Sequence, residues 1–368
     1  METVREGGVV LRVPEQPDAG AGAPVFFNPA MALNRDVTVA VLRAFREREP
    51  AAETYVDANT ASGVRAVRAA ADGWTVTGVD VNDEAVALAR ANLRANDLSG
   101  RVRARDANVE LHRHRYDVVD LDPFGTPVPF VDAAVRSARR LLCVTATDTA
   151  PLCGAHFAAG VRRYDAVPRN TEYHREMGLR VLLSALVRTA ARHDVGLVPW
   201  CSHATRHYVR TYLAVDRGAS PADAAREELG FLHHCQDCLY RTVEVDRLSH
   251  PPGTCPACGG GRVVTAGPLW LGPIRDRGFV AEVRGHLTDE LTERPAADRL
   301  LRRLEAELDV PHHFDQHVLC KRWGRPAGPM DDFLAALEAA GYRASRTHYS
   351  GTSFKTDAPV AAVREATA

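Results

Sequence analysis

Lysine is almost missing from this chain. Among 46 lysine and arginine residues, only Lys321 and Lys355 are lysines. Acidic residues number 47, so the formal net charge is −1. This balance gives no general attraction for nucleic acid, although a binder can still gather its cations on one face. The arginine bias, with the many alanines, is typical of GC-rich coding rather than of one function.

Long apolar runs are missing as well. No stretch of 18 apolar residues occurs, so we expect no membrane-spanning helix. The first residues, METVREGGVVLRVPE, mix charge with glycine and contain no apolar core, so we expect no signal peptide. Together these absences predict a cytoplasmic protein, and a monomer is the default expectation for its oligomeric state.

An α/β pattern fills the first half of the chain. The 368 residues predict two or three domains. From residue 53, valine-rich strand patterns alternate with helical patterns, which is typical of a doubly wound, mostly parallel sheet. The predicted strands are 53–58, 74–80, 101–106, 116–122, 141–148 and 207–215, and the predicted helices are 62–72, 84–96, 130–140 and 173–194.

The segments on either side of this pattern are of other kinds. Residues 1–50 predict a hairpin, a loop at 14–24 and a helix at 34–48, packed on the α/β domain of residues 51–217. The turn residues of DRGASPAD place a boundary near 216–220. Beyond it, at 218–368, we expect a smaller α+β domain with helices near 295–308 and 330–340 and a strand in YRASRTHYS (342–350).

Acidic residues end three successive predicted strands. Asp57 opens DANTASGVRA (57–66), whose small residues and single glycine let the backbone approach a ligand at a helix N-terminus. Asp80 ends the next strand, where a carboxylate can accept from ribose hydroxyls. Asp106 and Ala107 follow the third strand and could read an adenine edge. Each acid could instead cap a turn or helix. Because no GxGxxG loop is present, the common location favours adenosine carrying methionine, as in S-adenosylmethionine (SAM), over a dinucleotide.

The fourth strand ends in Asp122-Pro123-Phe124-Gly125. With SAM on the first three strand ends, this stretch would face the methyl group. The Asp122 carboxylate and the Asp122 or Pro123 carbonyl can accept from an exocyclic amino group, which directs the nitrogen lone pair at the methyl. Phe124 can stack on the base, which must first leave its helix. The alternative is a structural Pro-Gly turn with a buried phenylalanine.

Four of the eight cysteines form two C-x2-C pairs. The pairs are separated by 16 residues, a spacing that predicts a tetrahedral four-thiolate zinc site within 231–265. Four sulfur ligands leave no open position, so this Zn²⁺ would be structural. Disulfides and free thiols are the alternatives. The predicted ligands are Cys235, Cys238, Cys255 and Cys258, and the predicted buried thiols are Cys143, Cys153, Cys201 and Cys320.

Two groups of histidines are further candidates for metal or phosphate contacts. We expect His233 and His234, beside the first cysteine pair, to lie at the surface or contact phosphate rather than bind metal. For His312, His313 and His317 we favour structural or RNA-contact roles over a second metal site.

Seven stretches, in order, resemble one family, the tRNA (guanine26-N2)-dimethyltransferases, and most closely its archaeal members. The resemblance covers essentially the whole chain. It lies in VFFNPAMALNRD (25–36), DANTASGVRAVRAA (57–70), DLDPFGTP (120–127), ATDTAPLCGAH (146–156), the four-cysteine site, GPLWLGPI (267–274) and SRTHYSGTSFKTDAP (345–359).

The resemblance implies a class I SAM-dependent methyltransferase fold, Rossmann-like with a mostly parallel sheet, followed by a C-terminal tRNA-binding domain. It implies methylation of the exocyclic N2 of guanosine 26 in tRNA, giving N2-methyl- and N2,N2-dimethylguanosine, with SAM as the donor. The cofactor contacts that it assigns are Arg35, Arg65, Asp80, Asp106 and Ala107.

The resemblance also assigns a catalytic group. Asp122 matches the catalytic acid, beside Pro123, and Phe26 and Phe124 match rings that sandwich the target guanine. The chain departs from the family pattern at Asn59-Thr60, where a hydrophobic-Ser or Gly-Ser pair is more usual, and at Phe27, where tyrosine is common.

Two other functions stay open at this point. Because DPF also resembles the motif of other amino-methylating enzymes, the substrate could be DNA adenine or ribosomal RNA. Alternatively, the chain could be a zinc-ribbon binding protein whose α/β domain is inactive, although the intact set of strand-end acids argues against this.

Overall fold

The computed structural model describes residues 1–15 and 25–368, so most of the loop predicted at 14–24 lies outside the described residues. The chain forms two compact units, each assembled from separate segments. No helix in the described part of the chain is long and apolar enough to cross a bilayer. The domain limits predicted from the sequence stay predictions. Unit 1 comprises 1–145, 212–216 and 277–302, and unit 2 comprises 146–211, 217–276 and 303–368.

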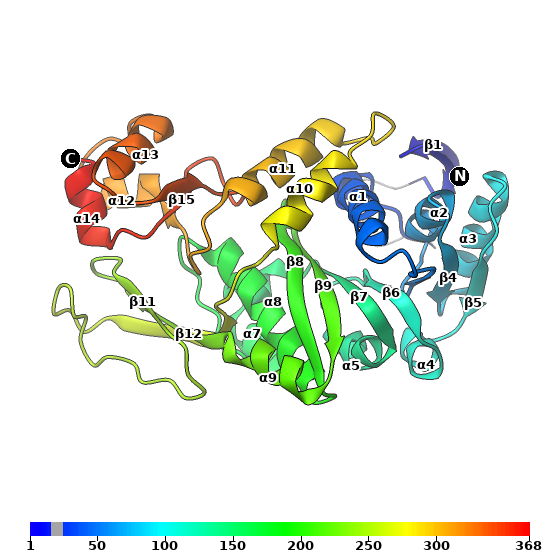
Figure 1. Cartoon of the computed structure of the whole chain (residues 1–368), viewed down its shortest axis with the longest axis horizontal. Helices are drawn as coiled ribbons and strands as arrows, with labels where there is room; N and C mark the ends of the chain where they lie inside the picture. Colours follow the sequence, from blue (N-terminus) through cyan, green and yellow to red (C-terminus); the bar gives the residue numbers. More distant parts are fainter. Residues whose placement is uncertain (16–24) are drawn as a thin grey trace. The chain divides into compact units, whose positions relative to one another are not determined.

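A seven-stranded sheet is the largest element of the fold (Figure 1). Its first five strands pair in parallel, because each is followed by a helix that returns the chain to the same edge. The strand sequence reverses between β3 and β6, which is the point where open α/β sheets bind ligands. In spatial order the strands are β5 (Arg101–Ala104), β4 (Thr75–Asp80), β3 (Thr54–Asp57), β6 (Tyr116–Leu121), β7 (Ala138–Ala146), β9 (Tyr208–Arg217) and β8 (Val195–Thr205).

The α/β methyltransferase-like fold class predicted from the sequence is confirmed, with local differences. The helix predicted at 130–140 ends at Ser137, because Ala138 to Arg140 already alternate as the start of β7. Strand β8 (Val195–Thr205) was not predicted, because Pro199 and the polar residues after it weaken its strand pattern. Helix α4 (Ala107–Arg113) was not predicted, although Asp106 caps it.

The helices of unit 1 cover the parallel strands. Figure 1 shows α1, α2 and α3 toward one face of the sheet and α4 and α5 toward the other. Two helices from later in the chain, α10 and most of α11, complete the unit. The helices are η1 (Pro29–Met31), α1 (Ala32–Arg48), α2 (Val64–Ala71), α3 (Asp83–Ala95), α4 (Ala107–Arg113), α5 (Val128–Ser137), α10 (Arg277–Gly285) and α11 (Arg294–Ala306).

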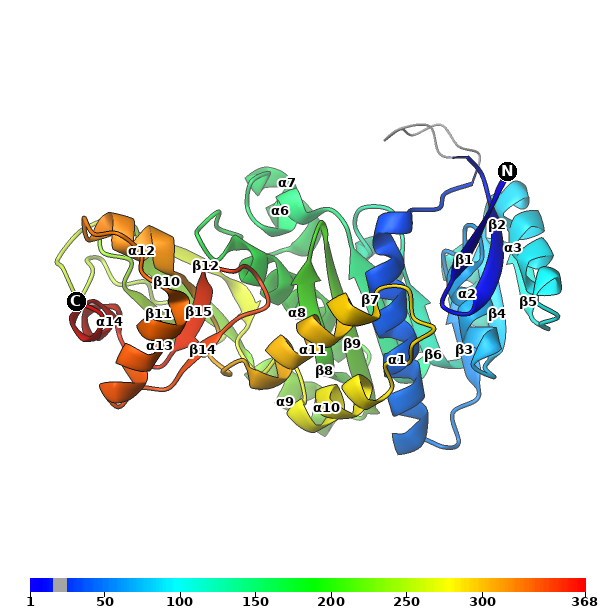
Figure 2. The same ribbon diagram turned by 90° about the horizontal axis from the view of Figure 1, so that it is seen from above.

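The chain begins with an antiparallel hairpin of β1 (Glu2–Glu6) and β2 (Val9–Val13), as predicted. Figure 2 shows it beside α2 and α3. Asn92 of α3 and Asn96, the C-cap of that helix, act as its partners in place of a third strand. Asn96 Oδ1 accepts from Val10 N and Asn92 Oδ1 accepts from Arg12 N, each at 2.8 Å. The amide of Asn92 also donates to the Arg12 carbonyl, so the hairpin is fixed to unit 1.

Unit 2 carries two small sheets and the remaining helices. The strand predicted at 342–350 is limited to its centre. The sheets have the orders β11-β10-β12 and β13-β15-β14. The elements are α6 (Thr149–Leu152), α7 (Phe157–Tyr164), α8 (His174–Ala191), α9 (Ala219–Glu227), β10 (Leu229–Cys235), β11 (Arg241–Glu244), β12 (Val263–Trp270), β13 (Phe314–Asp315), α12 (Gln316–Arg322), α13 (Met330–Ala339), β14 (Ala344–Arg346), β15 (Ser353–Thr356) and α14 (Val360–Ala366).

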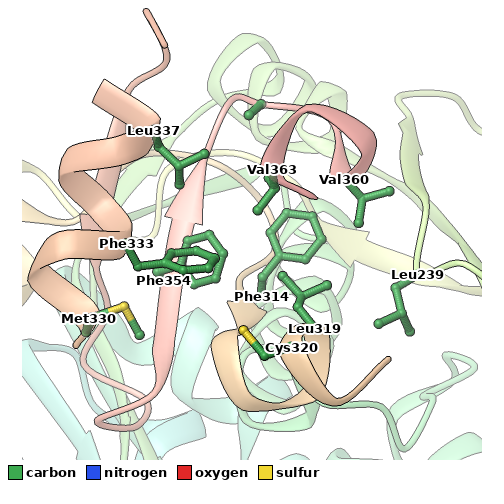
Figure 3. Close-up of a cluster of buried hydrophobic side chains, with 11 residues drawn as sticks. Leu239, Phe314, Leu319, Cys320, Met330, Phe333, Leu337, Phe354, Val360 and Val363 are labelled. Carbon is green, nitrogen blue, oxygen red and sulfur yellow. The ribbon is translucent and has the colours of Figure 1, made fainter. Parts of the chain in front are cut away.

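The C-terminal part of unit 2 has its own apolar core (Figure 3). Phe354 of β15 lies between Phe314 and Phe333, with ring centroids 5.8 and 5.1 Å away. Leu337, Val360 and other apolar side chains from α12, α13 and α14 close around these rings. This burial holds three short helices on a sheet too small to be stable by itself.

Beside this core lies a buried ionic cluster. The Lys355 side chain is 1% exposed, and its Nζ lies 2.8 Å from Glu176 Oε1 and 2.8 Å from Glu307 Oε1. Burial would raise the pKa of Glu176, but Lys355 and Arg180 outweigh it and hold that pKa well below its usual range. His313 Nδ1 also bonds to Glu176 Oε2, at 2.8 Å. The cluster joins α8 to β15 across a long stretch of sequence.

Candidate active site and metal centre

The register of the parallel strands collects the strand-end residues at one edge of the sheet. Asp57 is paired with Gly78 on one side and with Asp120 on the other, and Asp80 is paired with Ala104. Asp106 follows β5 and Asp122 follows β6, so both leave the sheet at the same edge. The structure therefore brings together the four acids that the sequence analysis selected.

The turn after β3 contains acceptor atoms without partners. Thr60 Oγ1 and Ala66 N donate to Asp57 Oδ2 at 2.8 and 3.2 Å. Among the described residues, nothing donates to the buried Asp57 Oδ1 or to the buried Asn59 Oδ1. Burial, with Asp120 as the next cause, raises the pKa of Asp57 to about 7. Orphaned buried acceptors at a ligand edge fit a cofactor that brings its own donors.

Gly63 lets this turn pass close to the neighbouring helix. Its φ is +80°, a left-handed conformation that glycine adopts at little cost, and a Cβ built there would lie 2.7 Å from the Ala89 Cβ. The first turn of α2 therefore sits directly against α3, and its N–H groups point toward the strand edge.

Asp80 and Asp106 also serve as local caps. Asp80 Oδ2 accepts from Ala61 N and its Oδ1 accepts from Asn82 N, both at 2.9 Å. Asp106 Oδ1 accepts from Asn108 N and Val109 N, at 2.8 and 3.3 Å. Capping and ligand binding are compatible, because Asp106 is exposed and its Oδ2 is not used by these bonds. Ala107 is the first residue of α4, so its N–H has no acceptor within the helix.

Asp122 is held by a buried arginine. Arg65 Nε donates to Asp122 Oδ2 at 2.7 Å, and the Arg65 side chain is 4% exposed. The rest of the guanidinium is fixed as well, since its terminal nitrogens donate to Asn34 Oδ1 at 2.5 Å and to Thr38 Oγ1 at 3.2 Å. Asp120 Oδ2 lies 3.8 Å away and balances the buried charge. The Asp122 side chain itself is 23% exposed.

Three of these supporting residues were not selected from the sequence. Asn34 and Thr38 lie one turn apart on α1, and their spacing of four residues places them on one helix face. Asp120 precedes Asp122 by two residues. Because side chains two apart in a strand point to the same face, this spacing could have identified Asp120 from the sequence. Tyr55 OH donates to Asp120 Oδ2 at 2.8 Å and completes the support behind Arg65.

Phe124, two residues after Asp122, touches Phe26. The ring centroids of Phe26 and Phe124 are 4.3 Å apart, with an interplanar angle of 73°. Their exposed fractions are 41% and 71%, which is high for phenylalanine. Pro123 between Asp122 and Phe124 is buried, and Gly125 has φ +72° with open space where a Cβ would stand. The buried proline fixes the turn, and the ring after it is exposed.

Arg35 is buried to the same degree as Arg65. Its Nε and one terminal nitrogen donate to the two carboxylate oxygens of Glu6, and both terminal nitrogens reach the Asn28 carbonyl oxygen at 3.1 Å. The guanidinium carbon is 5.1 Å from the Phe27 ring centroid. Protein groups thus occupy most of its donors.

The four paired cysteines converge in unit 2. All four sulfurs lie within 4.8 Å of one another, with Cys235 and Cys258 at 3.7 Å and Cys238 and Cys255 at 3.6 Å. These separations are those of sulfurs around one tetrahedral Zn²⁺ with bonds of about 2.3 Å. The turns agree, since Gly259 N donates to the Cys255 carbonyl and Leu239 N donates to the Cys235 carbonyl. The predicted thiolate set fits a structural zinc ion.

The neighbouring histidines differ in part from expectation. His233 and His234 are buried in β10, so the prediction of surface positions is wrong. His233 bonds Thr265 and Glu244, and Arg241 Nε donates to His234 Nδ1. Within residues 1–15 and 25–368, the histidines at 312, 313 and 317 belong to no cluster of metal ligands. The other four cysteines are buried, as predicted.

Comparison with known proteins gives one consistent result. The family model for N2,N2-dimethylguanosine tRNA methyltransferases matches residues 7–368. A tRNA (guanine(26)-N(2))-dimethyltransferase of Haloarcula marismortui is 58% identical over 99% of this chain and 99% of its own length. One from Methanosarcina mazei is 47% identical over 99% of this chain and 97% of its own length.

A solved structure agrees along the whole chain. It is a complex of Trm1 from Pyrococcus horikoshii with S-adenosyl-L-methionine. The TM-score is 0.89 and the sequence identity 33%, and the match covers 100% of this chain and 99% of that one.

Proposed function

The chain belongs to the N2,N2-dimethylguanosine tRNA methyltransferase family, and we propose that its site methylates the exocyclic N2 of guanosine 26 in tRNA, first to N2-methyl- and then to N2,N2-dimethylguanosine. SAM is the methyl donor. The observation that carries the proposal is the Asp122 carboxylate, held by Arg65 beside two exposed rings at the ligand edge of the sheet.

We place SAM at the carboxyl ends of β3, β4 and β5. Asp80 would accept from the ribose hydroxyls, and Asp106 with the Ala107 N–H would read the adenine edge. Arg35 and Arg65 are the family's further contacts. When bound, SAM supplies a methyl group activated on a sulfonium sulfur. The unpaired oxygens of Asp57 and Asn59 support this placement, because the amino group of a methionine moiety is a donor that they lack.

Asp122 would orient and deprotonate the amine. Arg65 occupies Oδ2, so Oδ1 is the oxygen that accepts an N2–H of the guanine. That hydrogen bond fixes the amino group with its lone pair directed at the methyl carbon. As the N2–C bond forms, the C–S bond breaks and its electron pair stays on sulfur. The N2 proton passes to Asp122, which acts as a general base.

The same geometry allows two rounds. N2-methylguanosine keeps one N2–H, and Asp122 Oδ1 can accept it in the second round as in the first. After two methylations no N2–H is left for the carboxylate to accept. The reaction therefore stops at the dimethyl product, because the amine has no N–H left to donate.

Phe26 and Phe124 would bind the extruded base. Their rings now meet edge to face at 4.3 Å, which leaves no room for a base between them. A sandwich therefore requires one ring to swing away, and Phe124 is the more exposed of the two. Stacking on both rings would offset part of the cost of unstacking guanosine 26.

The remaining assignments belong to the same proposal. We assign tRNA binding beyond the target base to the C-terminal residues 218–368, with zinc ordering residues 231–265. We also propose a cytoplasmic monomer. Sedimentation at micromolar concentration would reveal a dimer and contradict the monomer.

The decisive experiment compares Asp122→Ala and Asp122→Asn with the parent. Methyl transfer to tRNA transcripts with guanosine or adenosine at position 26 is followed by nucleoside mass spectrometry. We expect the parent to modify only the guanosine transcript, and both variants to lose about a hundredfold or more in rate while still binding SAM in calorimetry. Asp223→Ala, at an exposed position of α9, is the matched control.

Three results would contradict the proposal. Full activity of Asp122→Ala would remove the carboxylate from the mechanism. Methylation of ribosomal RNA or of DNA adenine, with tRNA left unmodified, would favour the other amino-methylating classes. A parent protein that binds no SAM would favour a zinc-ribbon binding protein.

A further inference from the structure

A carboxylate of the N-terminal hairpin is buried between two arginines of unit 1. Glu6 is 5% exposed. It accepts from Arg35 Nε at 2.6 Å and from an Arg35 terminal nitrogen at 2.5 Å, as a bidentate pair. Arg68 donates to the same carboxylate at 2.8 Å. Burial would raise the pKa of Glu6, but the two guanidinium groups outweigh it and lower the pKa, so the group is charged.

The hairpin turn is shaped for this contact. Gly7 has φ +55°, and a Cβ built there would lie 2.2 Å from an Arg68 terminal nitrogen. Only glycine lets the turn lie so close to the guanidinium. Arg68 is itself held by Asp36 Oδ1 at 2.6 Å. Because Asn92 and Asn96 fix β2 to α3, Glu6 is presented from a rigid support.

The far side of Arg35 holds the arm that carries Phe26. Both terminal nitrogens donate to the Asn28 carbonyl at 3.1 Å. Asn28 Oδ1 accepts from Ala30 N at 2.9 Å and so caps η1, which fixes the next residues too. Arg35 therefore links Glu6, on one side, to a backbone position two residues after Phe26.

The exposure of Phe26 and Phe27 indicates how this link orients the Phe26 ring. Asn28 has φ −118° and ψ 109°, which is extended backbone, where neighbouring side chains point to opposite sides. Phe27 is 5% exposed and lies against the Arg35 guanidinium. Phe26, by contrast, is 41% exposed, and its ring meets Phe124.

We propose that Glu6 is a positioning residue for the target base: through Arg35 and Asn28 it fixes the arm that presents Phe26 to the guanine. The inference rests on the proposed function, since it names what orients one ring of that site. The N-terminal hairpin would then help to position the substrate. Arg35 would help to position the base, in addition to its assigned contact with the cofactor.

Two variants remove the link by different means. Glu6→Gln keeps the size of the side chain and removes its charge, and Glu6→Asp keeps the charge and withdraws it by one methylene. Glu2→Gln, at an exposed position of the same strand, is the matched control. Thermal unfolding of each variant shows whether unit 1 is intact at the assay temperature.

The test is a double-mutant cycle with Phe26→Ala. In the parent background, Glu6→Gln should lower kcat/KM for tRNA about tenfold. In the Phe26→Ala background the same change should cost less than about twofold, because the ring that it positions is already gone. Equal losses in the two backgrounds would overturn the proposal, and so would a loss of SAM affinity large enough to account for the effect.

A second readout needs no activity. With 4-fluorophenylalanine at position 26, the ¹⁹F signal reports the surroundings of this ring. Glu6→Gln and Glu6→Asp should move or broaden it, and Glu2→Gln should leave it unchanged. An unmoved signal in both Glu6 variants overturns the proposal even if the enzyme methylates another nucleotide. Failure of the parent to modify guanosine 26 would instead count against the proposed function alone.

Discussion

Arg65 Nε and Asp122 Oδ2 lie 2.7 Å apart in a pair whose arginine is almost fully buried and whose aspartate is 23% exposed. The arginine approaches from inside the fold, where Asn34 and Thr38 hold its other nitrogens. One oxygen of the carboxylate is thus fixed from within, and the other is left at the surface of the site. In the proposed mechanism, Arg65 orients the Asp122 carboxylate from inside the fold, without contacting the guanine.

Arg65→Lys should therefore lower kcat for tRNA methylation by about tenfold, because a lysine ammonium cannot reproduce the fixed fork of bonds to Asp122, Asn34 and Thr38. Steady-state kinetics with saturating SAM measures it. Arg101→Lys, at an exposed position of β5, is the control. An unchanged kcat in Arg65→Lys would show that Asp122 is aimed by other groups.

Phe124→Ala should raise KM for tRNA about fivefold to a hundredfold, since stacking of one base on one ring contributes about 1–3 kcal/mol. SAM affinity should stay within about twofold, because the ring lies on the base side of the site. Kinetics over a range of tRNA concentrations, with calorimetry for SAM, tests both statements. Phe157→Ala, at an exposed phenylalanine of unit 2, is the control. A SAM affinity that falls with the ring would place Phe124 on the cofactor instead.

Asp57 should make stability depend on pH. Its folded pKa of about 7 exceeds the unfolded value of about 3.9, so the folded protein binds the extra proton between these limits. The free energy of unfolding contributed by Asp57 is fully present below about pH 4 and is lost as pH rises toward 7. Asp57→Asn has no such proton to release.

The measurement for Asp57 is denaturant unfolding of the parent and of Asp57→Asn at pH 5 and pH 8, without SAM. The difference between the two proteins should move in favour of the variant by about 3 kcal/mol at most over this interval. A difference that does not change with pH would mean that Asp57 is ionised throughout.

The four-cysteine centre should hold one zinc ion per chain. Elemental analysis of the purified protein measures it. Cys255→Ser should lose most of the metal and lower the thermal stability of unit 2, because metal binding free energy contributes to folding. Cys201→Ala, which removes a buried thiol outside the centre, should keep the zinc. A parent protein without metal, or with full metal in Cys255→Ser, would contradict the assignment.

Much of the site could be found from the sequence because its residues follow strands. In a parallel sheet, strand ends meet at one edge, so Asp57, Asp80, Asp106 and Asp122 could be grouped without coordinates. The predicted zinc ligands could also be selected from the sequence, because the spacing of the cysteine pairs reflects the geometry of metal binding.

What the sequence could not show depends on contacts between distant segments. Glu6 and Arg35 are 29 positions apart, and no local pattern joins a hairpin turn to the first turn of a helix. The start of β7 was assigned to a helix because Ala138 to Arg140 continue an amphipathic pattern, and pairing with β6 overrides it. His233 and His234, beside the first cysteine pair, were expected at the surface or on phosphate, whereas β10 is the central strand of its sheet.

The near absence of lysine has a practical consequence through the buried cluster of unit 2. Of the two lysines, Lys321 is exposed and Lys355 is 1% exposed between two glutamates. Amine-reactive reagents should acylate Lys321 in the folded protein and reach Lys355 only when unit 2 opens. Because Lys355 of β15 is paired with Glu176 of α8, the rate of its acylation should report that opening, and peptide mass spectrometry can measure it without an engineered label.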